Sequence, residues 1–375
     1  MINLILIVDP RNLVFGNSST LNRHKAYSES LKNDTQDKFR LGVISFHSQN
    51  EFSIDLIDKL YRIKIPRNLL SSKKTQKRFT MHYREMFNTH LLIAGDPWES
   101  FLSAVLFSKM IKSHPRIQVQ AHGDFGNRAW INLNWRNRIR SLIASSSLKF
   151  APEIRATTEL QANKLTEKYG VERGKIQVIP VPSIYSRDEI APALTTSRPG
   201  TLGLVGRIEE DRGLNNFVEL TRKLANVNHD FSIVVVGSGS SSDKLKNDLE
   251  RYLPLSRISF LGNIDPVNMS RAWNKLGVLV SCAPAESYGR AMRESLVHGV
   301  PVWATRSSGA MDLFKTARDG MEILNLADSA EDLNETFNQL LARSIDGDLQ
   351  TALLKSDRQL ISRLISSWVA SPPAI

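Results

Sequence analysis

Short apolar runs alternate along the first half of the chain with longer stretches that have helical spacing. The strands predicted from these runs are Ile2–Val8, Leu41–Phe46, Leu91–Ile93 and Ile117–Gln120. Helices are predicted at Pro97–Lys112 and Thr157–Tyr169, where Thr158 with Gln161 three residues later has the pattern of a helix cap. Residues 62–90 are basic and fit neither pattern clearly.

A strand predicted at Val178–Pro182 closes this half, and a polar stretch with Pro192 and Pro199 follows it. The same alternation then begins again. The strands predicted in the second half are Leu202–Val205, Phe231–Val236, Ile258–Leu261, Val278–Val280 and Val300–Ala304. The predicted helices are Asn215–Ala225, Asp243–Tyr252, Pro266–Lys275, Tyr288–His298 and Leu349–Trp368.

Fully apolar strands separated by helices indicate parallel sheets that are covered on both faces. The sequence therefore predicts an α/β protein with two Rossmann-like domains that face each other across a cleft. We place the first domain at residues 1–185, a linker at 186–200 and the second domain at 201–348. We expect a C-terminal helix and tail at 349–375, in a position to cross back to the first domain.

The net charge of +11 is concentrated in the first half of the chain. Residues 1–185 contain 28 lysines and arginines and 15 acidic residues, whereas the rest of the chain contains 21 and 23. Such asymmetry is typical of a domain that faces an anionic membrane, a nucleic acid or a phosphorylated substrate, and a solvated surface without a partner is the plain alternative. The apolar N-terminus lacks a basic leader region and no run of 18 apolar residues occurs, so we expect a first strand and no transmembrane helix. The single cysteine, Cys282, excludes an intramolecular disulfide and fits a reducing cytoplasm.

The strongest candidate chemistry lies between Cys282 and Pro301. A predicted strand ends near Ser281, a short loop carries Glu286, and Glu294 follows about two turns into the next helix. The free N–H groups and the positive dipole end at that helix start suit a diphosphate. The two carboxylates suit hydroxyl groups of a sugar and a ribose, and two ordinary surface acids are the plain alternative.

Two further loops follow predicted strands, at the edge of a parallel sheet where ligands bind. The loop after the strand at 202–205 carries Arg207 and Arg212, which are spaced to grip a diphosphate. His122 lies in a glycine-flanked loop after the strand at 117–120 and can hydrogen-bond a sugar or a phosphate. The plain alternatives are an exposed charged turn and a histidine that packs its own loop.

Together these motifs resemble the family-4 retaining glycosyltransferases, which have the GT-B fold. The matching pieces in the second half are Gly206-Arg207 with Arg212-Gly213, Val236-Gly-Ser-Gly239, Phe260-Leu-Gly262, Glu286 to Glu294, and His298-Gly-Val-Pro301. Those in the first half are Ala94-Gly-Asp-Pro-Trp-Glu99, His122-Gly-Asp-Phe125 and Val178-Ile-Pro-Val-Pro182. Their order is preserved over nearly the whole chain, and they are specific for fold and reaction type but not for the sugar.

The resemblance implies a role for each residue of these motifs. Arg207 and Arg212 would hold the donor diphosphate, Glu286 would bind the transferred sugar near its anomeric centre, and Glu294 would bind the donor ribose. His122 would orient the transferred sugar. The remaining donor-binding positions would be Gly206, Ser287, Tyr288, Gly289 and Arg290. The implied catalytic set is Glu286, His122, Arg207 and Arg212.

One region departs from the family pattern. Many relatives carry a Gly-Gly loop near the acceptor after the first strand, whereas here residues 9–17 contain the single glycine Gly16. The resemblance therefore assigns no acceptor-site residue.

The implied activity is that of a metal-independent hexosyltransferase that uses a nucleoside-diphosphate sugar as co-substrate and needs no cofactor. A divalent cation requires clustered carboxylates beside the phosphates, and the only Asp-x-Asp, at 346–348, lies in a polar C-terminal stretch. The implied acceptor is a glycan or a lipid-linked molecule in the synthesis of cell-surface polysaccharide or glycolipid. The same fold also serves epimerases, phosphorylases and catalytically silent donor-binding subunits.

The basic first half predicts a cytoplasmic protein that binds peripherally at the inner face of an anionic membrane. One basic cluster spans residues 62–84, and a second interleaves arginines with tryptophans; its members are Arg128, Trp130, Trp135, Arg136, Arg138 and Arg140. No nucleic-acid partner is expected, because the sequence has no helix-turn-helix, zinc-ligand or aromatic ribonucleoprotein signature.

Overall fold

The computed structural model of the chain describes residues 1–10, 18–47, 52–66, 72–111, 113–182, 199–265 and 268–370. The chain forms two compact units. Unit 1 consists of Met1–His122, Trp135–Pro182 and Arg358–Ile375, and unit 2 consists of Gly123–Asn134 and Ser183–Asp357. The predicted linker at 186–200 lies almost wholly outside the described residues. Two segments depart from a simple division along the chain, since Gly123–Asn134 packs with unit 2 and the chain from Arg358 packs with unit 1.

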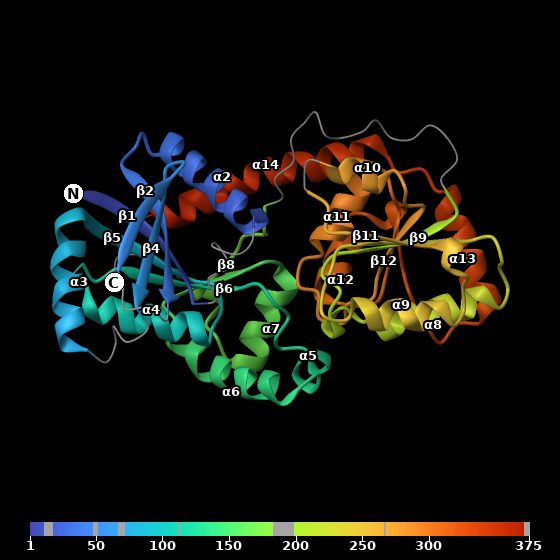
Figure 1. The fold of residues 1–375 in the computed structure, drawn as a ribbon, viewed down its shortest axis with the longest axis horizontal. Helices are drawn as coiled ribbons and strands as arrows, with labels where there is room; N and C mark the ends of the chain where they lie inside the picture. The colour runs from blue at the N-terminus through green and yellow to red at the C-terminus, as the bar shows by residue number, and fades with distance from the viewer. Residues whose placement is uncertain are drawn as a thin grey trace. The chain divides into compact units, whose positions relative to one another are not determined.

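Unit 1 is built on an eight-stranded sheet in the order β3-β4-β2-β1-β5-β6-β7-β8 (Figure 1). Its strands are β1 (Ile2–Asp9), β2 (Phe39–His47), β3 (Ser53–Ile57), β4 (Leu60–Pro66), β5 (Phe87–Ala94), β6 (Arg116–Ala121), β7 (Glu153–Ala156) and β8 (Ile176–Val178). Its helices are α2 (Ser18–Asp34), α3 (Lys73–Met86), α4 (Glu99–Met110), α6 (Trp135–Phe150), α7 (Glu159–Tyr169) and the last turns of α14 (Gly347–Val369). Neighbouring strands are parallel except β3 and β4, which are antiparallel.

The end of α14 belongs to the core of unit 1. Leu364, Ile365 and Trp368 are buried in one cluster with Ile5 of β1 and Tyr27 of α2. The rings of Tyr27 and Trp368 meet edge to face with centroids 5.8 Å apart. Because these side chains complete the layer beside the sheet, the last turns of α14 are part of the hydrophobic core and not a peripheral appendage.

The basic stretch at 62–90 resolves into β4, α3 and the start of β5. Ser72 caps α3 by accepting a hydrogen bond from the Thr75 amide, and Phe79 and Tyr83 are the buried residues of the helix. The antiparallel β3–β4 pair was not predicted. Charged residues alternate with the apolar residues of these two strands, so no continuous apolar run marks them in the sequence. Arg62 of β4, for example, lies opposite Asp55 of β3.

The strand predicted at Val178–Pro182 is displaced, since β8 covers Ile176–Val178 and ends there. Pro180 and Pro182 have no N–H group with which to extend a ladder. The buried Arg155 side chain also takes the next two carbonyls, donating from Nε to Ile179 O at 2.8 Å and from Nη2 to Pro180 O at 2.6 Å. A side chain therefore replaces the neighbouring strand at this point.

Two helix starts in unit 1 follow local capping rules. Thr158 accepts from the Gln161 amide at the start of α7, as predicted, and the Gln161 side-chain oxygen accepts from the amide and the hydroxyl of Thr157. Asp96 accepts from the amides of Trp98 and Ser100, so α4 begins at Glu99 and not at Pro97. The side-chain acceptors settle where each helix starts.

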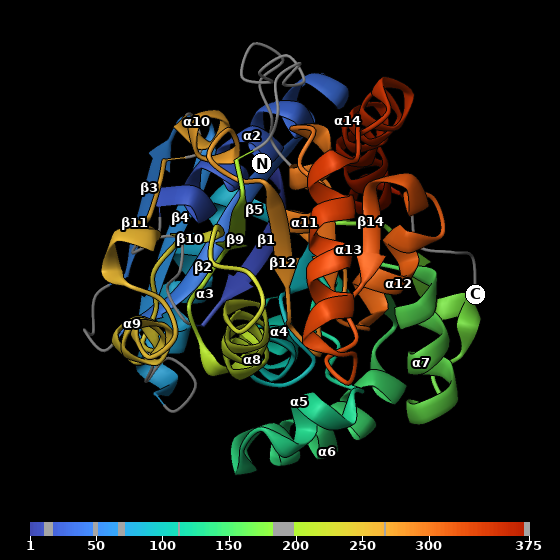
Figure 2. The ribbon, with the colours of Figure 1, turned by 90° about the vertical axis from the view of Figure 1, so that its right-hand side faces the viewer.

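Unit 2 is built on a parallel six-stranded sheet in the order β11-β10-β9-β12-β13-β14 (Figure 2). Its strands are β9 (Thr201–Val205), β10 (Ser232–Val236), β11 (Ile258–Gly262), β12 (Val278–Ser281), β13 (Val302–Ala304) and β14 (Met321–Ile323). Its helices are α5 (Arg128–Asn132), α8 (Leu214–Ala225), α9 (Ser242–Glu250), α10 (Met269–Trp273), α11 (Arg290–Val297), α12 (Ser308–Phe314), α13 (Ala330–Ala342) and the first part of α14. Every strand predicted in this half is present.

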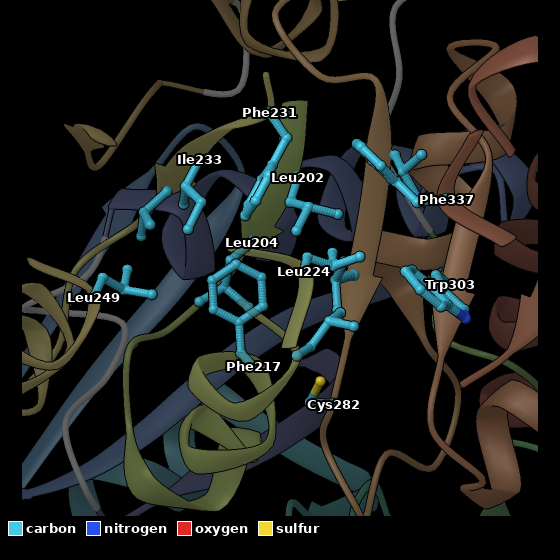
Figure 3. Close-up of a cluster of buried hydrophobic side chains, with 14 of the residues drawn as sticks. Leu202, Leu204, Phe217, Leu224, Phe231, Ile233, Leu249, Cys282, Trp303 and Phe337 are labelled. Carbon is cyan, nitrogen blue, oxygen red and sulfur yellow. The ribbon is translucent and has the colours of Figure 1, made fainter. Parts of the chain in front are cut away.

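Apolar clusters cover both faces of the unit 2 sheet. One of them packs α8, α9 and α13 on the sheet through side chains that include Phe217, Leu249 and Phe337 (Figure 3). Cys282, just beyond the end of β12, is buried in the same cluster, and burial raises the pKa of its thiol to about 12. A thiol with such a pKa stays protonated near neutral pH and is not a nucleophile. No described helix combines the length and apolar composition that a bilayer crossing requires.

Candidate functional site

The loop after β9 is held close to the end of the sheet by glycines. Gly206 has φ +135° and donates its N–H to the carbonyl of Val236, while a Cβ at Gly237 would overlap the Gly206 carbonyl. Gly213 has φ +69°, and a Cβ there would overlap the carbonyl of Cys282. Only glycine fits these two close approaches. The loop with Arg207 and Arg212 is therefore fixed at the carboxyl edge of the sheet.

Arg212 and Glu286 form an ion pair across this edge. The Nη1 atom of Arg212 lies 2.8 Å from Oε2 of Glu286, and their side chains are 33% and 22% exposed. The other carboxylate oxygen, Oε1, accepts from the amides of Gly289 at 3.1 Å and Tyr288 at 3.4 Å. Glu286 thus occupies the start of α11, where unpaired N–H groups favour an anion.

Arg207 is held much less firmly than Arg212. Its side chain is 63% exposed, and its Nη2 atom lies 3.5 Å from the carboxylate of Asp211, which is also 3.9 Å from Arg212. Exposed pairs of this kind contribute little to stability, typically about 0.2–1 kcal/mol. The side chain is available to an anionic ligand at small energetic cost.

The loop from Glu286 to Gly289 rests on a second set of contacts. The Gly309 amide donates to the Glu286 carbonyl at 2.8 Å, and a Cβ at Gly309 would overlap the backbone of Tyr288. Arg293 stacks over the Tyr288 ring at 4.2 Å and pairs with Asp312 at 3.1 Å. These contacts fix the backbone that presents Glu286.

Glu294 lies one turn into α11, where its Oε1 atom is 3.3 Å from Nε of Arg290. Burial raises the pKa of the Glu294 carboxyl, and the positive charge of Arg290 partly opposes this shift.

A pocket of about 440 Å³, counting the open space at its mouth, lies at this edge of unit 2. It is lined by Leu204, Val205, Arg207, Arg212, Leu279, Val280, Ser281, Cys282, Ala283, Glu286, Gly289, Ala291 and Met292. The pocket brings together four of the predicted site residues, Arg207, Arg212, Glu286 and Gly289. The other predicted site residues of unit 2 do not line the pocket; they are Gly206, Ser287, Tyr288, Arg290 and Glu294.

His122 belongs to unit 1, where it follows β6 and its Nε2 atom is hydrogen-bonded to Oε1 of Gln120. The chain enters unit 2 directly after it. Buried Asp124 accepts from the Ser308 hydroxyl at 2.8 Å, and the Asn127 side chain donates to the Pro284 carbonyl at 2.8 Å. Asp124 belongs to the motif His122-Gly-Asp-Phe125, so the sequence indicated this residue as a candidate. No sequence motif indicated Ser308.

The family model and two of the known proteins that are similar in sequence to this chain are named as glycosyl transferases. Residues 186–358 match the family model described as glycosyl transferases group 1. The chain is 27% identical over 176 residues to 2-deoxystreptamine glucosyltransferase from Streptomyces kanamyceticus, which covers 44% of this chain and 46% of that protein. It is 24% identical over 135 residues to 2-deoxystreptamine N-acetyl-D-glucosaminyltransferase from Niallia circulans, 35% of each chain. The matched region is thus less than half the length of these relatives.

Two solved structures resemble nearly the whole chain. Sucrose-phosphate synthase from Thermosynechococcus elongatus has a TM-score of 0.68 at 16% identity, over 97% of this chain and 95% of its own. Anabaena HepE, solved in complex with UDP and glucose, has a TM-score of 0.68 at 15% identity, over 98% and 99%.

The chain has the GT-B fold of these solved structures, and residues 186–358 are similar to the glycosyl transferases group 1. The predicted fold class is thereby confirmed. The similar proteins are named as transferases and synthases, which does not favour an epimerase or a phosphorylase.

Proposed function

We propose that this protein transfers a hexose from a nucleoside-diphosphate sugar to an acceptor hydroxyl, with retention at the anomeric carbon. The observation that carries the proposal is the Arg212–Glu286 pair at the start of α11, inside the unit 2 pocket. Cationic and acidic side chains there stand beside backbone N–H groups, which are the partners that a diphosphate and sugar hydroxyls require. UDP, which is bound in the similar HepE structure, is the first nucleotide to test.

The carboxylate of Glu286 occupies a position that suits the donor diphosphate. It accepts from Arg212 and from two amides at the helix start, which are the donors that a phosphate group would use. A diphosphate carries more negative charge than one carboxylate, so it competes for Arg212 and recruits the exposed Arg207. Donor binding then releases Glu286 to accept hydrogen bonds from the sugar.

In the proposed reaction the bond between the anomeric carbon and the diphosphate oxygen breaks, and its electron pair leaves with the diphosphate. The acceptor hydroxyl oxygen forms the new bond on the same face of the sugar. Its proton passes to the departing diphosphate. Arg207 and Arg212 stabilise the negative charge that develops on the leaving group, and Glu286 stabilises the positive charge near the anomeric carbon.

We further propose that this chemistry needs neither a metal ion nor a cofactor. The positive charge that a divalent cation would supply comes here from Arg207, Arg212 and the start of α11. Within the described residues, no group of three or more histidine, cysteine or acidic side chains is placed to hold a metal ion. A test with chelator present in the transfer assay separates this proposal from a metal-dependent reaction, which would stop.

The proposed setting is the cytoplasmic face of a membrane, and the proposed acceptor is a glycan or a lipid-linked molecule in cell-surface polysaccharide or glycolipid synthesis. The net charge of residues 1–185, with 28 basic and 15 acidic residues, supports an anionic surface or acceptor as the partner. His122 is proposed to orient the transferred sugar.

The test begins with the full chain and a panel of nucleoside-diphosphate sugars in a thermal-shift assay, because a bound donor raises the melting temperature. The donor that binds is then used, labelled in the sugar, in a transfer assay with glycan and lipid-linked acceptors. Glu286→Gln is expected to lose transfer. Glu209→Gln is the matched control, since Glu209 binds the Ser240 amide outside the pocket. Equal transfer by wild type and Glu286→Gln would contradict the proposal.

A further inference from the structure

Helix α6 presents an apolar stripe to solvent. Five large apolar side chains along its length are exposed: Trp135 65%, Ile139 46%, Leu142 72%, Ile143 45% and Phe150 80%. Single exposed apolar residues are ordinary on a protein surface, but several on one helix are not. These apolar residues face outward because other residues of α6 make its contacts with the rest of unit 1.

The packed side of α6 carries small and polar residues and a single large apolar one, Leu148. Asn137, Ala144 and Leu148 are its buried positions. Ser141 is hydrogen-bonded to the Tyr169 hydroxyl of α7 at 3.1 Å, and Ser147 donates to the carbonyl of Pro97. Figure 1 shows α6 lying beside α7 at the rim of unit 1. These contacts fix the rotation of the helix, so the apolar stripe is turned outward by the fold itself.

Basic residues flank the stripe. At about 100° per residue, the five exposed apolar side chains fall within an arc of roughly 100° opposite the buried face. Arg138 and Lys149 project on one side of this arc, and Arg136 projects on the other. The helix has four basic residues and no acidic residue. Arg140, the fourth, is paired with Glu99 at 2.9 Å near the packed side.

We propose that α6 is a membrane-binding helix whose apolar stripe inserts into the interfacial region of an anionic bilayer. An apolar arc bordered by arginine and lysine, with an aromatic residue at each end, is what a helix lying in that interface requires. The stem of each basic side chain covers apolar surface while its charge reaches lipid phosphates. This surface does not depend on the donor pocket, which belongs to unit 2.

A second copy of the chain is a poorer occupant than lipid. Two α6 helices packed stripe to stripe would set arginine against arginine, and the helix has no acidic residue to compensate them. Anionic headgroups supply the missing negative charge, and acyl chains accept the apolar side chains. Charge and shape therefore both select a lipid surface.

The test uses the full chain and flotation with vesicles of equal parts phosphatidylcholine and phosphatidylglycerol, at low and high salt. Leu142→Gln is expected to bind roughly ten-fold more weakly at both salt concentrations, because apolar insertion is not screened. Arg138→Gln is expected to bind roughly five-fold more weakly at low salt only.

Two matched variants serve as controls. Both lie on unit 2: Leu255→Gln removes another leucine that is more than half exposed, and Arg251→Gln removes an exposed arginine at the end of α9. Both are expected to float like the wild type within about two-fold. Because these four positions lie outside the donor pocket, each variant should still show the donor-induced thermal shift, so a failure of the proposed reaction is distinguishable from a failure of this proposal.

Two outcomes would overturn the proposal. In the first, Leu142→Gln floats as well as Leu255→Gln. In the second, Leu142→Gln leaves vesicle binding unchanged but converts a dimer into a monomer in sedimentation, which would assign the stripe to a second copy. Fluorescence supports the insertion if vesicles shift the emission to the blue and Trp135→Phe removes that shift.

Discussion

Arg212 and Glu286, which are 74 residues apart in the chain, are joined by a hydrogen-bonded ion pair of 2.8 Å. Through the second oxygen of Glu286 the pair extends to the amide of Gly289. One carboxylate therefore links the loop after β9 to the start of α11. The two loops that line the pocket are coupled before any ligand arrives.

Arg212→Ala is expected to lower kcat/KM for sugar transfer strongly. By analogy with removal of one donor from an oxyanion site, the loss is about 2–4 kcal/mol of transition-state stabilisation. Arg212→Lys should retain part of the activity because it keeps the charge. Arg222→Ala, which breaks an α8 surface pair with Glu219, is the control and should leave kcat/KM unchanged. Steady-state kinetics with the identified donor provide the measurement.

In the absence of donor, the ion pair should contribute little to folding. Both partners are partly exposed, so a double-mutant cycle of Arg212→Ala and Glu286→Ala is expected to give a coupling of about 1 kcal/mol or less. Urea unfolding of the four proteins measures it. A coupling several times larger would show that the pair is structural, and the expected exchange with a diphosphate would then be too costly.

Gly213→Ala should destabilise unit 2 and disturb donor binding. A Cβ at this position meets the Cys282 carbonyl, and φ is +69°, so strain of about 1–3 kcal/mol is expected. Gly347→Ala is the matched control, because a Cβ there has no neighbour within 4 Å. Denaturation midpoints distinguish the two substitutions. Equal midpoints would mean that the loop relaxes without cost.

The carboxyl of Glu294, whose side chain is only 19% exposed, should make stability depend on pH. Burial raises its pKa above the ordinary value of 4.5, so the folded protein binds more protons than the unfolded chain between the two pKa values. Stability contributed by this group is therefore present below pH 4.5 and falls as the pH rises through the raised value. Glu294→Gln should remove this decline, as followed by urea unfolding at a series of pH values.

Glu209 provides a control of opposite sign. Hydrogen bonds from Ser240 lower its pKa, so its contribution is present above the ordinary pKa and is lost as the pH falls through the lowered value. Glu209→Gln should therefore remove a loss of stability in acid. If Glu294→Gln and Glu209→Gln changed the pH profile in the same direction, the sign assigned to Glu294 would be wrong.

Trp368→Ala should unfold unit 1 far more readily than unit 2. This side chain is 1% exposed in the core formed with Tyr27 and Leu364, and truncation of a buried tryptophan costs about 3–5 kcal/mol. Trp135→Ala is the matched control, because Trp135 is exposed on α6. Hydrogen exchange resolved by segment shows which unit loses protection. A uniform loss over both units would mean that they unfold together.

Much of the fold follows from periodicity alone. The strands β9 to β13 of unit 2 are mainly apolar runs and were predicted, because a parallel sheet covered on both faces requires such runs. Strand β14 was not predicted, because it is only three residues long and has a glutamate at its centre. The β3–β4 pair and β8 were not predictable in the same way. Charged residues mask the first, and the Arg155 guanidinium, not sequence pattern, ends the second.

The residues of the candidate site were predicted from the sequence, whereas the contacts between them were not. The motif residues Arg207, Arg212, Glu286 and Gly289 were predicted together and line one pocket. Their roles toward a donor stay predictions. The pairing of Arg212 with Glu286, and the supporting stack of Arg293 on Tyr288, had no sequence signal, because long-range partners depend on how loops meet.

The sequence by itself determined the alternation of strands and helices, the glycines that permit close backbone approach, and the residues that can carry the chemistry. Tertiary structure decided which of those residues meet and which face of each helix is buried. Helix α6 illustrates the difference, since its small and polar residues pack against α7 and Pro97 while Leu142 and Phe150 face solvent. Periodicity reveals that a helix has two faces, but only its neighbours determine which one is covered.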